Sequence, residues 1–113
     1  MKDPMTIEKA ISRLNKENGA VFTKLMRRGA MIVEYYAPKK WDREKLHTKD
    51  EIYVIASGQA TMHREGQKFT CFTGDILFVA AGIDHRFENF SEDFATWVIL
   101  FSSDVTNPSD KLP

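Results

Sequence analysis

Short apolar runs, each ended by turn residues, follow one another through most of this 113-residue chain. Runs of four to eight residues rich in β-branched and aromatic side chains, bounded by Gly, Asn or Asp, are typical of β-strands. Many such runs at regular spacing predict an all-β sandwich or barrel. The expected strands are 21–27, 31–37, 51–57, 59–63, 67–71, 76–80, 85–90 and 94–101.

The N-terminal stretch has a helical period instead. Its apolar residues recur at i, i+3, i+4 and i+7, as Ile7, Ala10, Ile11 and Leu14. This stripe predicts one helix over about residues 5–17, packed on the barrel or on a partner. Asp3 before Pro4 is the expected N-cap, and Asn18-Gly19 is the expected stop.

Length and composition predict a single domain over residues 1–113, with the barrel at about 20–102 and a polar tail at 103–113. Lys+Arg and Asp+Glu both number 16, and no basic stripe indicates a nucleic-acid partner. No apolar run is long enough to span a membrane, and no secretory segment follows Met1. The single Cys71 excludes an internal disulfide and fits a cytoplasmic protein. Zero formal net charge gives little colloidal repulsion, so self-association is expected.

Three side chains at the ends of these runs have metal-binding chemistry: His47, Glu51 and His85. Two imidazoles and one carboxylate can occupy one face of an octahedral divalent ion and leave other positions open. Residues four apart share a face of a strand, so His47 and Glu51 can point the same way if the strand begins near 47. Tyr53 follows on that face. His85 is 34 residues beyond Glu51, so only a long-range arrangement of strands can bring them together.

These residues lie in two motifs that resemble those of the cupin family. The first is H47-T-K-D-E51 followed by Gly58. The second comprises Gly74, Ala80, Gly82, His85 and Asn89, with Ala80 where the family usually has Pro. The resemblance covers about residues 30–101. It implies a cupin-type β-barrel (a double-stranded β-helix, or jelly roll), often a homodimer, that holds a metal ion.

Carried over to this chain, the family's metal ligands would be His47, Glu51 and His85. The ion would be Fe, Mn, Ni, Cu or Zn. The family's further His, two residues before His47, is replaced by Lys45, and a protonated lysine cannot ligate a cation. Water could then fill the fourth position; Lys45 could turn to solvent or bind an anionic substrate beside the metal; or the site could bind metal weakly or not at all. The three-ligand site is the favoured alternative.

Several other residues are expected to have no part in metal binding. His63 is predicted at the surface, Cys71 is predicted to be inert, and the glycines of the motifs are predicted to occupy turns. Glu34 and Tyr36 share a strand face with Ile32, and they are expected either on a pocket wall or in solvent.

Three functions are compatible with this sequence. The first is a metal-dependent enzyme, such as a dioxygenase, isomerase, decarboxylase or lyase, acting on a small organic molecule; all four activities occur among cupins. Tyr53 is its best inward acid–base candidate, followed by Lys45. The second is a non-catalytic cupin that binds or senses a small molecule. The third is a storage-like or structural barrel without metal.

Overall fold

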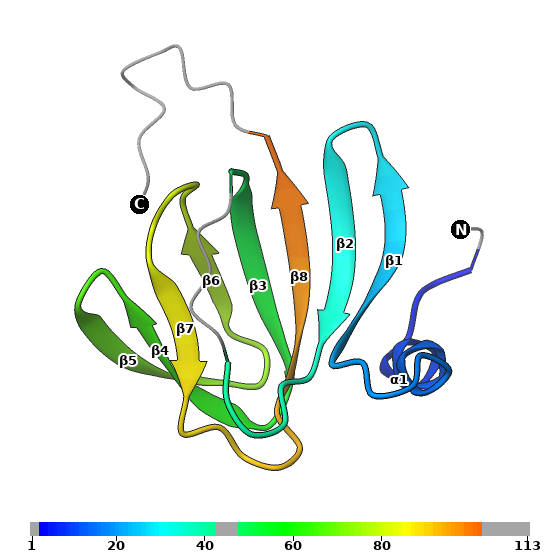
Figure 1. The fold of residues 1–113 in the computed structure, drawn as a ribbon, viewed down its shortest axis with the longest axis horizontal. Helices are drawn as coiled ribbons and strands as arrows, with labels where there is room; N and C mark the ends of the chain where they lie inside the picture. Colours follow the sequence, from blue (N-terminus) through cyan, green and yellow to red (C-terminus); the bar gives the residue numbers. More distant parts are fainter. Residues whose placement is uncertain (1–2, 43–47, 103–113) are drawn as a thin grey trace.

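The computed structural model describes residues 3–42 and 48–102 (Figure 1). The predicted all-β fold with one N-terminal helix is confirmed, and the predicted strand ends differ from the observed ones by only one or two residues. The elements are α1 (Ile7–Asn15), β1 (Phe22–Arg28), β2 (Met31–Tyr36), β3 (Asp50–Ser57), β4 (Gln59–Arg64), β5 (Gln67–Phe72), β6 (Ile76–Val79), β7 (His85–Glu88) and β8 (Ala95–Phe101). Lys45, His47 and the polar tail at 103–113 lie outside the described residues.

Helix α1 starts later than predicted. The expected N-cap at Asp3 was wrong, because Thr6 caps the helix by accepting the amide N–H of Lys9 at 3.1 Å. Thr6 has an extended backbone and stands directly before the apolar stripe, so its hydroxyl satisfies an amide of the first turn that would otherwise have no partner. Within the described part of the chain, no helix is both long and apolar enough to cross a bilayer.

The strands form two antiparallel sheets. One has five strands in the order β1-β2-β8-β3-β6, and the other has three in the order β5-β4-β7 (Figure 1). Among the described strands, no backbone pairing joins the two sheets into a continuous barrel. Side-chain contacts link them instead, including two hydrogen bonds to backbone groups. Asp42, beyond the end of β2, accepts the amide of Phe87 in β7 at 2.7 Å, and Arg64 in β4 donates to the carbonyl of Phe78 in β6 at 2.6 Å.

The core lies between the inner faces of the two sheets. Ile55 and Val98 from the larger sheet belong to one buried cluster with Met62 and Phe87 from the smaller sheet. The outer face of the larger sheet carries a second cluster, in which residues of α1 pack against β1, β2, β3 and β8: Ala10, Leu14, Leu25, Tyr35, Ala56 and Ala95. The helix packs at the β1–β2 edge of that sheet (Figure 1).

Gly58, the glycine that follows the first motif, joins β3 to β4. Its backbone shows why a glycine is needed at this position. Its φ is +72°, a left-handed value that L side chains rarely adopt. A Cβ at this position would stand 2.8 Å from the Cα of Phe94. The prediction that this glycine serves a turn is therefore confirmed, and close backbone approach adds a second reason for it.

Candidate metal site

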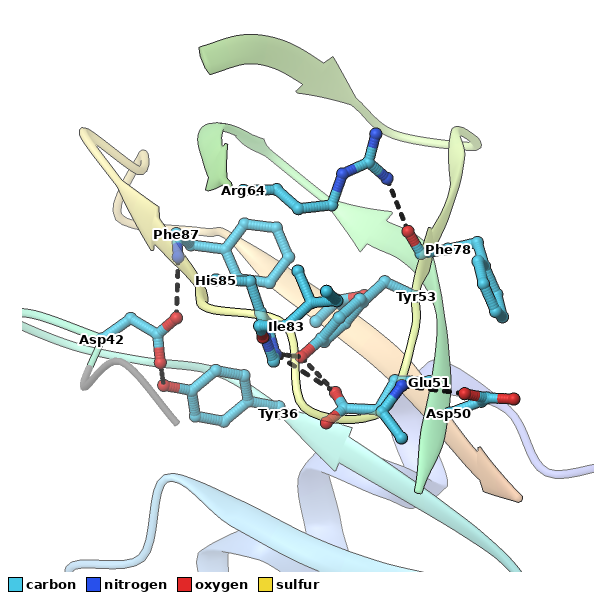
Figure 2. A network of polar contacts seen from close by, with 12 residues as sticks. Tyr36, Asp42, Asp50, Glu51, Tyr53, Arg64, Phe78, Ile83, His85 and Phe87 are labelled. Carbon is cyan, nitrogen blue, oxygen red and sulfur yellow. Dashed lines mark hydrogen bonds and ion pairs between the residues drawn. The ribbon is translucent and has the colours of Figure 1, made fainter. Parts of the chain in front are cut away.

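Glu51, Tyr53 and His85 meet inside the fold. The Tyr53 hydroxyl donates a short hydrogen bond to Oε2 of Glu51 and lies 2.9 Å from Nε2 of His85 (Figure 2). Oε2 of Glu51 is 3.5 Å from the same imidazole nitrogen. All three residues are buried, with exposed fractions of 1%, 6% and 5%. The structure thus brings together three of the residues singled out from the sequence.

Strand alternation and register produce this meeting. Glu51 and Tyr53 are two residues apart on β3, so both point to the inner face. Glu51 is paired with Val79 of β6, and the turn after β6 leads directly to His85 at the start of β7. The β3–β6 pairing therefore places His85 beside the glutamate despite their separation in sequence.

The backbone fixes the His85 ring. Its Nδ1 lies 2.8 Å from the carbonyl oxygen of Ile83. A carbonyl can only accept, so Nδ1 carries the proton, and in the neutral ring Nε2 holds the lone pair that a metal ion would take. A hydrogen bond to the remote ring nitrogen is also how metal-bound histidines are usually oriented.

Burial and the negative charge of Glu51 shift the pKa values of His85 and Tyr53. Burial is the largest influence on His85 and lowers its pKa, but hydrogen bonds to Glu51 and Ile83 and the charges of Glu51 and Asp42 together hold that pKa above its ordinary value. Burial, followed by the charge and hydrogen bond of Glu51, raises the pKa of Tyr53 well above 10. Tyr53 is therefore a neutral hydrogen-bond donor at physiological pH.

A cavity of about 270 Å³ opens from this group along the inner face of the five-stranded sheet. Glu34 and Tyr36 line this cavity. Of the two placements that the sequence allows, a pocket wall or solvent, the structure shows the pocket wall. Tyr36 donates a short hydrogen bond to Asp42, and burial, followed by this carboxylate, raises the Tyr36 pKa. The rest of the wall is mostly apolar, with one lysine: Phe22, Lys24, Ile32, Val98 and Leu100.

The described donors fit part of a metal site. Glu51 offers an oxygen and His85 a nitrogen that converge on one place. Two ligands of one ion, each at about 2.1 Å, stand about 3 Å apart, so the observed separation needs little adjustment. Over residues 3–42 and 48–102, no group of three or more His, Cys, Asp or Glu side chains is placed to hold an ion. The third predicted ligand, His47, lies outside that part of the chain.

The other residues considered from the sequence do not belong to this group. His63 lies on β4, where it is partly exposed and paired across the sheet with Lys68 and Arg86. Cys71 is buried and donates to the Ala60 carbonyl, and burial raises its pKa, so both features disfavour a reactive thiolate. Asn89 follows β7 with a left-handed φ of 51°.

Two functional candidates have no signal in the sequence. Asp42 and Asp50 each accept a backbone amide close to His85. Asp42 lies outside both motifs, and Asp50 lies within the first one only as a residue between His47 and Glu51. The alternation of side chains along a strand does not relate either aspartate to the amide that it accepts. Only the spacing of folded elements could have identified them.

Comparison with known proteins decides the family. A family model described as a cupin domain matches residues 32–101, which is more than half of the chain. The chain belongs to the cupin family. This cupin is 30% identical over 85 residues to an uncharacterized protein of Streptomyces coelicolor, covering 74% of this chain and 81% of that protein.

Solved structures show the same fold. A cupin 2 conserved barrel domain protein of Salinispora arenicola superposes with a TM-score of 0.66 at 19% identity, covering 80% of this cupin and 86% of that chain. A DMSP lyase of Ruegeria pomeroyi superposes with a TM-score of 0.62 at 21% identity, covering 76% of this cupin and 48% of that chain. At these identities, the two structures support the cupin-type jelly roll and no particular activity.

Proposed function

We propose that this cupin binds one divalent transition metal at the inner end of its cavity, with Glu51, His85 and His47 as ligands. The observation that carries the proposal is the approach of Oε2 of Glu51 to Nε2 of His85, at 3.5 Å, in a buried place. A carboxylate that is 1% exposed is costly to bury unless a positive charge compensates it. A metal ion at this point would supply that charge.

Tyr53 is the side chain best placed to act on a substrate. Its hydroxyl faces the cavity beside Glu51 and His85, and its raised pKa keeps it protonated. It can therefore donate a hydrogen bond or a proton to an oxygen of a molecule in the cavity. A metal bound beside it would act as a Lewis acid on such an oxygen. Lys45, which lies outside the described residues, stays the second candidate.

The cavity favours a small organic substrate with an apolar part. Ile32, Val98 and Leu100 form an apolar part of the wall, and Glu51, Tyr53 and His85 supply converging polar groups. This arrangement would hold the apolar part of a ligand and direct its oxygen toward Tyr53. The reaction would be of the dioxygenase, isomerase or lyase type.

A non-catalytic binding or sensing cupin is the second candidate. The hydrogen bonds that Tyr53 makes with Glu51 and His85 favour it, because they already engage the one described acid–base candidate. Such a protein would bind metal and ligand without turnover. Steady-state turnover of a bound ligand, lost in Tyr53→Phe, would separate the enzyme from the sensor.

Elemental analysis of tag-free protein, purified without chelator, tests the metal proposal. We expect near-stoichiometric Fe, Mn, Ni, Cu or Zn in the wild type and a loss of most of it in Glu51→Gln and His85→Gln. His63→Gln is the matched control, because it removes an imidazole from the outer side of β4 and should leave the metal content unchanged. Equal metal content in all four proteins, or none even after reconstitution, would overturn the proposal.

A further inference from the structure

Two aspartates accept backbone amides on either side of His85. Oδ1 of Asp50 accepts the N–H of Ala81 at 2.8 Å, four residues before the histidine. Oδ2 of Asp42 accepts the N–H of Phe87 at 2.7 Å, two residues after it. Both carboxylates come from the part of the chain that forms the five-stranded sheet, whereas His85 begins a strand of the other sheet (Figure 2).

Asp50 acts on the turn that orients the imidazole. The turn is closed by a hydrogen bond from the Ile83 amide to the Ala80 carbonyl at 3.2 Å. The Ile83 carbonyl then accepts from Nδ1 of His85. Asp50 is only 7% exposed, and a charged acceptor makes its bond to Ala81 stronger than a neutral one would be. Since Asp50 is the neighbour of Glu51 on β3, it ties the glutamate's strand to the histidine's turn.

Asp42 acts on strand β7 itself. Among the strands of residues 3–42 and 48–102, β7 pairs only with β4, so none of them pairs with its other edge. Asp42 supplies an acceptor at that edge, and its second oxygen accepts from the Tyr36 hydroxyl of β2. His85 and Phe87 lie on the same face of β7, so a bond at Phe87 restrains the strand that carries the imidazole.

We propose that Asp42 and Asp50 are positioning residues that hold the His85 imidazole in place and in orientation against Glu51. This inference rests on the proposed metal site. Ligands must be held to within about 0.5 Å for productive coordination, and groups that orient a ligand typically contribute about 10–100-fold to metal affinity. Neither aspartate would touch the ion; each acts through the backbone on either side of His85.

Zn²⁺ titration of the metal-free full-length protein by calorimetry tests the proposal. We expect Asp42→Ala and Asp50→Ala each to weaken Zn²⁺ binding by about tenfold or more. Asp42→Asn and Asp50→Asn keep an oxygen acceptor and should restore most of the affinity.

Asp75→Ala is the matched control for a general loss of stability. Asp75 also accepts a backbone amide, that of Phe72 at 2.8 Å, but in the turn between β5 and β6. Its loss should lower the melting temperature without weakening Zn²⁺ binding. If Asp42→Ala and Asp50→Ala bind Zn²⁺ within twofold of the wild type, or no more weakly than Asp75→Ala, the inference is overturned.

A second readout keeps this inference separate from the metal proposal. The chain has three histidines, so the ring ¹⁵N resonances of His85 can be assigned in metal-free protein. We expect the wild type to show protonated Nδ1 at high pH, and the two alanine variants to show averaging between tautomers. Failure of the wild type to bind Zn²⁺ would refute the metal proposal alone. Unchanged His85 resonances in both variants would refute the positioning roles.

Discussion

The hydroxyl of Tyr53 lies 2.9 Å from Nε2 of His85, although 32 residues separate them in the chain. The same hydroxyl donates to Glu51, which makes Tyr53 the link between the two described candidate ligands. The phenol therefore occupies the position from which it can assist either ion binding or substrate chemistry.

Tyr53→Phe separates these two roles. The change keeps the ring and removes one buried hydroxyl, so we expect a loss of about 1 kcal/mol in the free energy of unfolding. Metal content should stay near that of the wild type, because the hydroxyl is not a proposed ligand. If the protein is an enzyme, kcat should fall about 100-fold or more, as expected on removal of an acid–base group. Urea unfolding, elemental analysis and steady-state kinetics measure the three quantities. Loss of the metal in Tyr53→Phe would contradict this division of roles.

The stability of metal-free protein should depend on His85 and on pH. The folded-state pKa of His85 is raised above its ordinary 6.5. The folded state therefore binds the proton more tightly than the unfolded state does, and the resulting stabilisation is complete below about pH 6.5. It is lost as the pH rises through the folded-state pKa. Urea unfolding of chelator-treated protein at a series of pH values from 5.5 to about 9 measures it. His85→Gln should remove this part of the pH dependence, and an unchanged profile in that variant would contradict the assignment.

Gly58→Ala should be one of the most damaging glycine substitutions. The new Cβ would meet the Phe94 backbone at 2.8 Å in addition to the left-handed φ, so we expect a loss of about 3 kcal/mol. Gly66→Ala is the control, because its φ is also positive, at +79°, but no atom lies within 4 Å of the added Cβ. There the loss should be about 1 kcal/mol. Melting temperatures of the two variants give the comparison, and equal losses would show that the contact with Phe94 is relieved without cost.

A homodimer stays a prediction, and the outer face of the five-stranded sheet is the surface that supports it. Beside α1, an apolar groove of about 320 Å³ is lined by Met5, Leu25, Met26, Val33, Val54, Trp97 and Ile99. Antiparallel sheets usually expose polar residues on the face away from the core, so an apolar outer face indicates a covered surface. We expect Val54→Arg to shift the protein from dimer to monomer in light scattering. Phe72→Arg, at a 52% exposed position of β5, should leave the mass unchanged. A monomeric wild type would refute the dimer.

Periodic features of the sequence predict most of the fold. Alternation on β3 places Glu51 and Tyr53 on one face. Of the predicted apolar stripe of α1, Ala10 and Leu14 lie in a buried cluster, whereas Ile7 and Ile11 are 37% and 41% exposed. Where these predictions succeed, each depends on local geometry alone. The motif spacing, through the resemblance to cupins, adds His85 to the group.

Contacts made by side chains outside the strand period were not predictable. Asp42 bonds to an amide 45 residues away, and Asp50 bonds to one 31 residues away. No period or motif relates such partners, since the approach depends on how turns of one sheet meet strands of the other. The prediction of Asp3 as the N-cap was wrong for a local reason. Thr6 is also a good capping residue, and it stands nearer the apolar stripe.

The most direct test of the central claim is a Zn²⁺ titration of metal-free protein followed by the ring ¹⁵N resonances of its three histidines. The proposed site predicts that His47 and His85 shift together and saturate at one equivalent, while His63 stays in place. Glu51→Gln should weaken that response strongly. If His85 does not respond, or His63 responds in its place, then Glu51 and His85 do not form a metal site in this cupin.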